Sequence, residues 1–107
     1  MILQDMADTG AQIVEIDSKV DMGTAKVTIG SGTTIMGNLD PSAVLLLGTP
    51  DLVEDESRCV IEKAGKGGGF ILGSGCEVSP ITSVHNIKAM VKTARETTYP
   101  LKQYGFK

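Results

Sequence analysis

Short apolar runs alternate along the chain with amphipathic segments, and turn residues separate the two kinds of segment. Three runs rich in β-branched or other apolar residues predict strands at residues 11–17, 33–38 and 67–73. Around these runs, apolar residues recur at the three-to-four spacing that an amphipathic helix requires. We therefore expect helices over residues 1–9, 22–29, 50–64 and 83–96, with one or two further helical turns over 42–47.

Capping residues support the bounds of the two middle helices. Asp21 and Thr49 are residue types that accept hydrogen bonds from a first helical turn, and Pro50 suits a first helical position. Gly30 and Gly65 follow the two helices, where glycine commonly ends a helix. Both helices are therefore predicted with a start signal and a stop signal.

The order of the predicted elements indicates an α/β fold. Helices lie between successive strands, and such long crossovers return the chain to the same edge of the sheet, which makes the strands parallel. Three parallel strands leave two open sheet edges, which expose unpaired backbone groups. We expect the sheet to be extended, either by a partner or as part of something larger.

Composition excludes several function classes. The chain has 107 residues, 41% of them apolar, and a net charge of -3, which is typical of one soluble domain. No apolar run approaches the roughly 18 residues of a membrane-spanning helix, and no basic signal segment opens the chain, so we expect a cytoplasmic protein. The 10 basic residues are unclustered and aromatics make up only 4%, so we expect no nucleic-acid partner.

Candidate site residues stand where the predicted strands end. The loop 73–77 places Cys76 between a strand and a helix, at the edge where parallel α/β folds carry their ligands. A ligand-facing thiol and a tight turn with a small residue both fit this position. Asp17 and Asn38 stand on the same rim, and a ligand role and a loop-capping role are both open for them. A single thiolate does not hold zinc by itself.

Other conspicuous residues favour structural roles. Cys59 lies within a predicted helix and is expected to be half-buried by packing. The glycines of 65–69 precede a strand, whereas a phosphate loop follows one. His85, the only histidine, is expected in solvent, because it lies away from the predicted apolar face of the last helix. That face is expected to consist of Ile87, Met90, Val91 and Ala94.

Six segments resemble, in order and spacing, the C-terminal third of the uroporphyrinogen decarboxylase superfamily. They are Met6–Gly10, Ile16–Asp21, Gly37–Pro41, Gly48–Pro50, Gly69–Pro80 and Asn86–Met90. Within the superfamily they look most like the corrinoid-dependent methyltransferases, which pass a methyl group from a methylated corrinoid protein to coenzyme M. The resemblance covers residues 1–96 and leaves 97–107 as a tail.

The resemblance implies a partial (β/α)8 TIM barrel. The chain would carry the last three βα units, whereas a whole barrel has about 250 residues. We therefore expect a C-terminal fragment that is not catalytically competent alone. A chain start within a predicted helix and the open sheet edges agree with this expectation.

The resemblance also implies the site. Cys76 matches a zinc ligand of the methyltransferases, whose other ligands are an upstream His-x-Cys pair that this sequence lacks. Asp17 and Asn38 would bind substrate at the barrel mouth. Zinc is the implied cofactor, and the implied partners are a methylated corrinoid protein as donor and a coenzyme M-like thiol as acceptor. His85 departs from the family, whose members commonly carry an acid at this position.

Two alternatives stand beside methyl transfer. In the first, the chain would be a non-catalytic partial-barrel module that completes its sheet by self-association or with an N-terminal half. In the second, it would be a relative of the decarboxylases proper. In those decarboxylases the loop around Cys76 resembles Gly-His-Gly, so the cysteine favours methyl transfer over decarboxylation.

Overall fold

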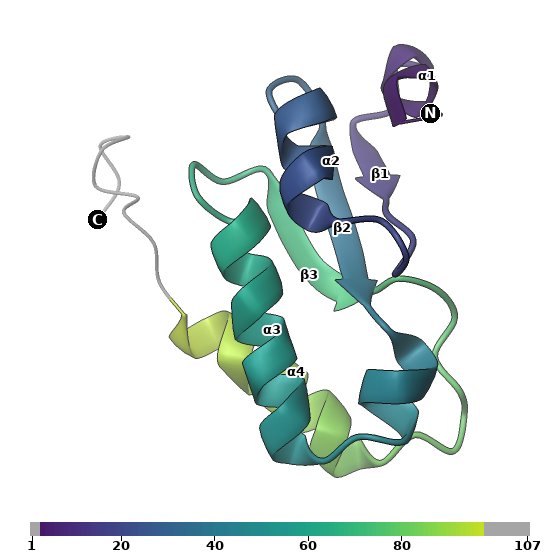
Figure 1. Ribbon diagram of the computed structural model, residues 1–107, viewed down its shortest axis with the longest axis vertical. Helices are drawn as coiled ribbons and strands as arrows, with labels where there is room; N and C mark the ends of the chain where they lie inside the picture. The colour runs from purple at the N-terminus through teal and green to yellow at the C-terminus, as the bar shows by residue number, and fades with distance from the viewer. Residues whose placement is uncertain (1–2, 98–107) are drawn as a thin grey trace.

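The chain folds into a sheet with helices packed against it, as a computed structural model of residues 3–97 shows (Figure 1). A short π-helix, η1, follows the second strand. The elements in chain order are α1 (Leu3–Asp8), β1 (Ile13–Glu15), α2 (Met22–Ile29), β2 (Thr34–Leu39), η1 (Pro41–Leu46), α3 (Pro50–Ala64), β3 (Phe70–Ser74) and α4 (Val84–Glu96). Apart from Thr97, the predicted tail lies outside the described residues.

The predicted parallel sheet is confirmed. Its strand order is β1-β2-β3, and both pairings are parallel. Ile35 of β2 stands opposite Val14 of β1 on one side and Phe70 of β3 on the other. The three arrows in Figure 1 point the same way, so the loops that follow the strands meet at one edge of the sheet.

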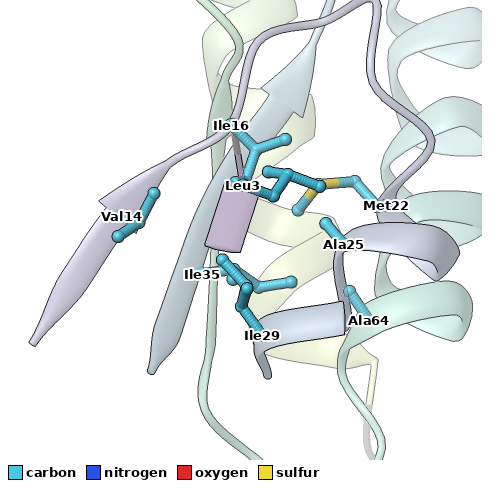
Figure 2. Close-up of a cluster of buried hydrophobic side chains, with 8 residues drawn as sticks. All are labelled: Leu3, Val14, Ile16, Met22, Ala25, Ile29, Ile35 and Ala64. Atoms are coloured by element: carbon cyan, nitrogen blue, oxygen red, sulfur yellow. The ribbon is translucent and has the colours of Figure 1, made fainter. Parts of the chain in front are cut away.

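The core lies between the sheet and the helices on one of its faces. Ile35 is fully buried at the centre of a cluster that α1, α2 and the end of α3 cover (Figure 2). Its members are Leu3, Val14, Ile16, Met22, Ala25, Ile29, Ile35 and Ala64. A second cluster joins the end of β2 to η1, α3 and α4 through Leu39, Val44, Leu45, Val53 and Ala89.

The other face of the sheet carries exposed apolar side chains. Side chains alternate between the two faces along a strand, so Met36 points away from the helices that cover Ile35. Ile71 pairs with Met36 and therefore lies on this other face. Ile71 is 42% exposed, and Ile13 of β1 is 51% exposed. The molecule is accordingly flat, with extents of 35 × 35 × 18 Å.

The third strand starts later than its sequence indicates. Residues 67–73 were the predicted strand, but the strand begins at Phe70. Gly67, Gly68 and Gly69 have φ values of 85°, 81° and 69°, a left-handed backbone that is incompatible with a strand. These glycines instead form the turn that leads from α3 into β3.

The expected burial of Cys59 is wrong, because its side chain is exposed. The buried residues of α3 include Ser57 and Ile61, which lie two positions before and after Cys59. A residue at that offset points to the opposite side of a helix, since successive residues turn by about 100°. Cys59 therefore faces solvent.

The predicted apolar face of the last helix is wrong in part. Val91 is 39% exposed, whereas α4 buries Asn86, Ala89 and Thr93. The Asn86 Nδ2 donates hydrogen bonds of 2.8 Å to the carbonyl oxygens of both Leu45 and Gly48, which turns this polar edge of α4 inward. His85 is exposed, as expected.

Candidate functional site

Three loops meet at the carboxyl edge of the sheet. They connect β1 to α2, β2 to η1, and β3 to α4 (Figure 1). Asp17, Asn38 and Cys76, the three residues singled out in the sequence, lie at this edge, one after or at the end of each strand. The parallel order of the strands is what brings residues so far apart in sequence to one rim.

Asn38 ties the first loop to the second strand. It is 7% exposed, and its Nδ2 donates to the carbonyl oxygens of Asp17, at 2.9 Å, and Val20, at 2.5 Å. Asp17 is therefore joined to Asn38 through its backbone. These hydrogen bonds hold the β1–α2 loop in place, and the ligand role of Asn38 stays a prediction.

The loop that carries Cys76 is held against the other two. The Gly75 N–H donates to the Leu39 carbonyl oxygen at 2.7 Å. A Cβ on Gly75 would lie 2.3 Å from the Ser18 backbone nitrogen, so the loop passes too close to the first loop for any side chain. The next residue, Cys76, presents an exposed thiol, and its carbonyl accepts a hydrogen bond from the Ser74 hydroxyl.

The carboxylates at this edge support their own loops. The Asp17 Oδ1 accepts a 2.8 Å hydrogen bond from the Lys19 N–H, and Asp17 remains exposed. The Asp40 Oδ1 accepts hydrogen bonds of 2.9 Å from the backbone N–H groups of Ser42 and Ala43, at the start of η1. Each carboxylate has a second oxygen that these bonds leave free for a ligand.

The described residues by themselves do not form a zinc site. Zinc in catalytic sites takes three protein ligands and keeps a fourth position open. Residues 3–97 hold no group of three His, Cys, Asp or Glu side chains placed to bind a metal. Cys76, with its exposed thiol, fits the role of one ligand in a site that other residues complete.

A cavity of about 320 Å³ opens beside the first loop. Ser18, Asn38 and Asp40 line it from the sheet edge, and Asp21 and Lys63 line it from the helices. Glu56, Val60 and Lys63 of α3 also line it and Cys76 does not, so the cavity lies on the helix side of the rim. The cavity and the thiol are thus separate features of one edge.

An ion pair stands at the wall of this cavity. The Lys63 Nζ lies 3.1 Å from the Asp21 Oδ1. A hydrogen bond from the Thr24 N–H, followed by the one from Lys63, lowers the pKa of Asp21 below its usual 3.8. The hydrogen bond to Asp21 raises the pKa of Lys63 above its usual 10.5. The pair therefore joins α3 to the start of α2.

We expect the Asp21→Asn variant to be less stable than the wild type at pH 7. Asparagine keeps a capping oxygen but loses the charge. Because folding lowers the pKa of Asp21, this carboxylate contributes to the free energy of unfolding above pH 3.8. The contribution disappears as the pH falls through the pKa of the folded state. Because folding raises the pKa of Lys63, its contribution to the free energy of unfolding is present below pH 10.5. That contribution is lost as the pH rises through the pKa of Lys63 in the folded state.

Urea unfolding of both proteins across this pH range tests the expectation. The difference in the free energy of unfolding should shrink in acid and in strong base. Asp51→Asn is the control for the loss of one negative charge. Asp51 is an exposed residue in the first turn of α3, and its carboxylate forms no ion pair within residues 3–97. Equal stability of wild type and Asp21→Asn at pH 7 would contradict the prediction.

The sequence pattern predicts the rim, but two contacts at the rim have no clear signal in the sequence. Gly75 is the contact point between two loops, and its only signal in the sequence is a glycine beside Cys76. Lys63 reaches Asp21 across 42 positions of the chain, and no local pattern marks such a pairing. Both contacts depend on packing between elements that are distant in sequence.

The comparisons with known proteins agree on one family. The profile of the uroporphyrinogen decarboxylase (URO-D) family matches residues 1–97. The uroporphyrinogen decarboxylase of Nostoc punctiforme is 36% identical over 98 residues, which are 92% of this chain and 27% of the relative. The methylcobamide:CoM methyltransferase MtaA of Methanosarcina barkeri is 35% identical over 99 residues, which are 92% of this chain and 28% of the relative.

Structural similarity points the same way. A methyltransferase from Methanosarcina mazei has a TM-score of 0.79 and 31% sequence identity, over 89% of this chain and 27% of that one. The chain thus spans about a quarter of the length of the relatives it matches. No helix in residues 3–97 is long and apolar enough to cross a membrane. The family profile, the curated relatives and the solved structure together show that the chain belongs to the uroporphyrinogen decarboxylase family.

Proposed function

We propose that this chain forms the C-terminal part of a barrel that moves a methyl group from a methylated corrinoid protein to the thiol of coenzyme M. The observation that carries the proposal is the exposed thiol of Cys76, on a loop fixed at the carboxyl edge of the sheet. The identity of 35% to a methylcobamide:CoM methyltransferase supports it. In TIM barrels, this edge is the face that carries the active site.

Cys76 serves in this proposal as one ligand of a zinc ion. Two further ligands come from outside the described residues, which is why the chain is not catalytically competent alone. Zinc, when bound, lowers the pKa of a thiol that it coordinates and so favours the thiolate that accepts the methyl group. The contribution of this chain is to hold the Cys76 sulfur at the rim.

Asp17 and Asn38 complete the proposed mouth of the barrel. Asp17 is exposed at the rim, and in this proposal its second carboxylate oxygen contacts the substrate. Asn38 acts from behind, because its amide fixes the backbone of Asp17 through a 2.9 Å hydrogen bond. Substrate binding therefore depends on both residues, with Asp17 as the contact and Asn38 as the support.

A chimeric barrel tests the proposal. The segment of Methanosarcina barkeri MtaA that aligns with this chain is replaced by this chain, so that the rest of the barrel supplies the missing strands. We expect the purified chimera to contain an equivalent of zinc and to methylate coenzyme M. The Cys76→Ser variant should lose the zinc, since serine does not provide a thiolate ligand.

Cys59→Ser is the matched control. This cysteine is also exposed but lies on α3, away from the rim, so its loss should leave the zinc content unchanged. Metal analysis, circular dichroism and a coenzyme M methylation assay are performed on all three proteins. A folded chimera that keeps its zinc after Cys76→Ser would refute the assignment of Cys76 as a ligand.

Exposed apolar residues on the sheet favour a second candidate, a non-catalytic module that completes its sheet with another copy. Ile13 and Ile71 are 51% and 42% exposed on a face that no helix of residues 3–97 covers. Sedimentation velocity on the full chain separates the two functions. A tight dimer without metal supports the non-catalytic module. A monomer supports the proposal that the chain is one part of a larger barrel.

Similarity to uroporphyrinogen decarboxylases favours a third candidate, a decarboxylase relative. The identity of 36% to the Nostoc punctiforme enzyme equals, within a percentage point, that to the methyltransferase. The same chimera distinguishes the two, because a decarboxylase site binds a porphyrinogen and does not need Cys76. Binding of a uroporphyrin by the chimera, unchanged by Cys76→Ser, would favour decarboxylation.

A further inference from the structure

Another cavity lies at the opposite edge of the sheet, where the strands begin. It has a volume of about 550 Å³. Its walls are the turn from α2 to β2 and the turn from α3 to β3, which Figure 1 shows at the amino-terminal ends of the strands. The whole length of the sheet separates this cavity from Cys76, so it is not part of the candidate site described above.

The cavity concentrates positive charge in an acidic protein. Lys26 and Lys66 line it, and no Asp or Glu does. Neither lysine forms an ion pair with a carboxylate of residues 3–97. The chain as a whole has a net charge of -3, so the positive charge of this cavity is opposite in sign to that of the whole chain. Such an uncompensated charge attracts anions.

Hydrogen-bond donors without protein acceptors also line the cavity. Lys26 is half-buried, and its Nζ donates to the Gly68 carbonyl oxygen, which leaves two of the three ammonium hydrogens for a ligand. Burial lowers the pKa of Lys26, and a bound anion would oppose that shift. Thr33, which is 8% exposed, also lines the cavity and adds a hydroxyl group to its wall.

The glycine turn leaves room for an anion beside its backbone. Gly67, Gly68 and Gly69 have positive φ values, and the Gly68 N–H closes the turn by donating to the Gly65 carbonyl oxygen at 2.9 Å. A Cβ placed on Gly68 would meet nothing within 4 Å, so open space lies next to the turn. The absence of side chains lets a ligand approach this backbone.

We propose that this cavity, which we call the lysine pocket (Lys26, Thr33, Lys66 and Gly67–Gly69), binds a phosphate group. A phosphate monoester carries a charge of about -1.5 to -2 at pH 7 and three strong acceptor oxygens. The pocket offers the ammonium groups of Lys26 and Lys66, the hydroxyl of Thr33 and a glycine turn without side chains. Free phosphate and a small phosphorylated molecule share this chemistry, and the test below separates them.

Titration of the full 107-residue chain with inorganic phosphate tests the proposal. The amide resonances of Gly67, Gly68 and Gly69 are followed at constant ionic strength, with sodium chloride as the comparison salt. We expect saturable shifts with phosphate alone. The double variant Lys26→Gln and Lys66→Gln should bind phosphate at least about tenfold more weakly, since each lysine contributes a charge-assisted hydrogen bond.

The variants are chosen to keep the fold. Glutamine at position 26 retains a donor for the Gly68 carbonyl, and the single Lys66→Gln variant changes only an exposed side chain. Lys92→Gln removes the same charge from the exposed side of α4 and should leave phosphate binding unchanged. If either the Lys66→Gln or the double variant weakens binding no more than Lys92→Gln, the pocket is not the site.

A second titration with glycerol 3-phosphate identifies the source of the phosphate group. Tighter binding of the ester than of inorganic phosphate indicates a phosphorylated molecule, and tighter binding of inorganic phosphate indicates the free ion. Shifts that do not saturate, or that sodium chloride reproduces, would overturn the proposal. The zinc content of the chimera is independent of every one of these outcomes, so this proposal and the proposed function fail separately.

Discussion

Replacement of Gly75 by alanine should destabilise the chain by about 3 kcal/mol, the upper part of the usual range for an added methyl group in a tight contact. The new Cβ would lie 2.3 Å from the Ser18 nitrogen and 2.7 Å from the Ser18 Cα. Both are backbone atoms, so no side-chain rotation relieves the contact. One of the two loops must therefore move, and Cys76 moves with its neighbour.

Gly32→Ala is the matched control for this variant. Gly32 is exposed at the other edge of the sheet, and a Cβ there would meet nothing within 4 Å. We expect the control to change the free energy of unfolding by less than about 0.5 kcal/mol. Urea unfolding measures both changes, and amide spectra should show shifts at Ser18 and Cys76 in Gly75→Ala alone. Equal stability of the two variants would contradict the loop contact.

Local signals in the sequence predicted most of the helices. Asp21 and Thr49 accept hydrogen bonds from the N–H groups of Thr24 and Leu52, as residues at an N-cap do. The bounds of α2 and α3 agree with the prediction because caps are encoded within a few residues of the helix end. The parallel sheet likewise followed from the order of elements along the chain.

Long-range contacts explain what the sequence pattern got wrong. The apolar spacing of the last helix includes Val91, but the contacts of Asn86 with Leu45 and Gly48 decide which face turns inward. The two hydrogen bonds of the Asn86 amide offset part of the cost of burying it, and they depend on where η1 and the turn after it lie. The sequence of α4 by itself contains no information on that position.

The candidate site was predictable to the level of the rim and no further. Parallel strands place Asp17, Asn38 and Cys76 at one edge, so the residues were found from topology. The hydrogen bonds of Asn38 could not be predicted, because they depend on which carbonyl oxygens the folded loop brings to its amide. The exposed fraction of a side chain and its hydrogen-bond partners follow only from the folded arrangement.

The two faces of the sheet should respond differently to truncation. Ile35→Ala is expected to cost about 4 kcal/mol, because it opens a cavity in a fully packed cluster. Ile35 is fully buried among residues of three helices and β1 (Figure 2). Ile71→Ala, at a side chain 42% exposed on the other face, should cost less than about 1.5 kcal/mol in the chain alone. Urea unfolding of both variants and of wild type measures the contrast.

The chimeric barrel turns this contrast into a test of the architecture. If the exposed face of the sheet becomes the barrel interior, Ile71 is packed by side chains from the other strands, as TIM-barrel interiors are filled. Ile71→Ala should then lower the free energy of unfolding more in the chimera than in the chain alone. The effect of Ile35→Ala should stay nearly the same, because the helices that pack on Ile35 are already present in the chain. An unchanged cost for Ile71→Ala would show that this face stays uncovered, and that the sheet is not completed as a barrel.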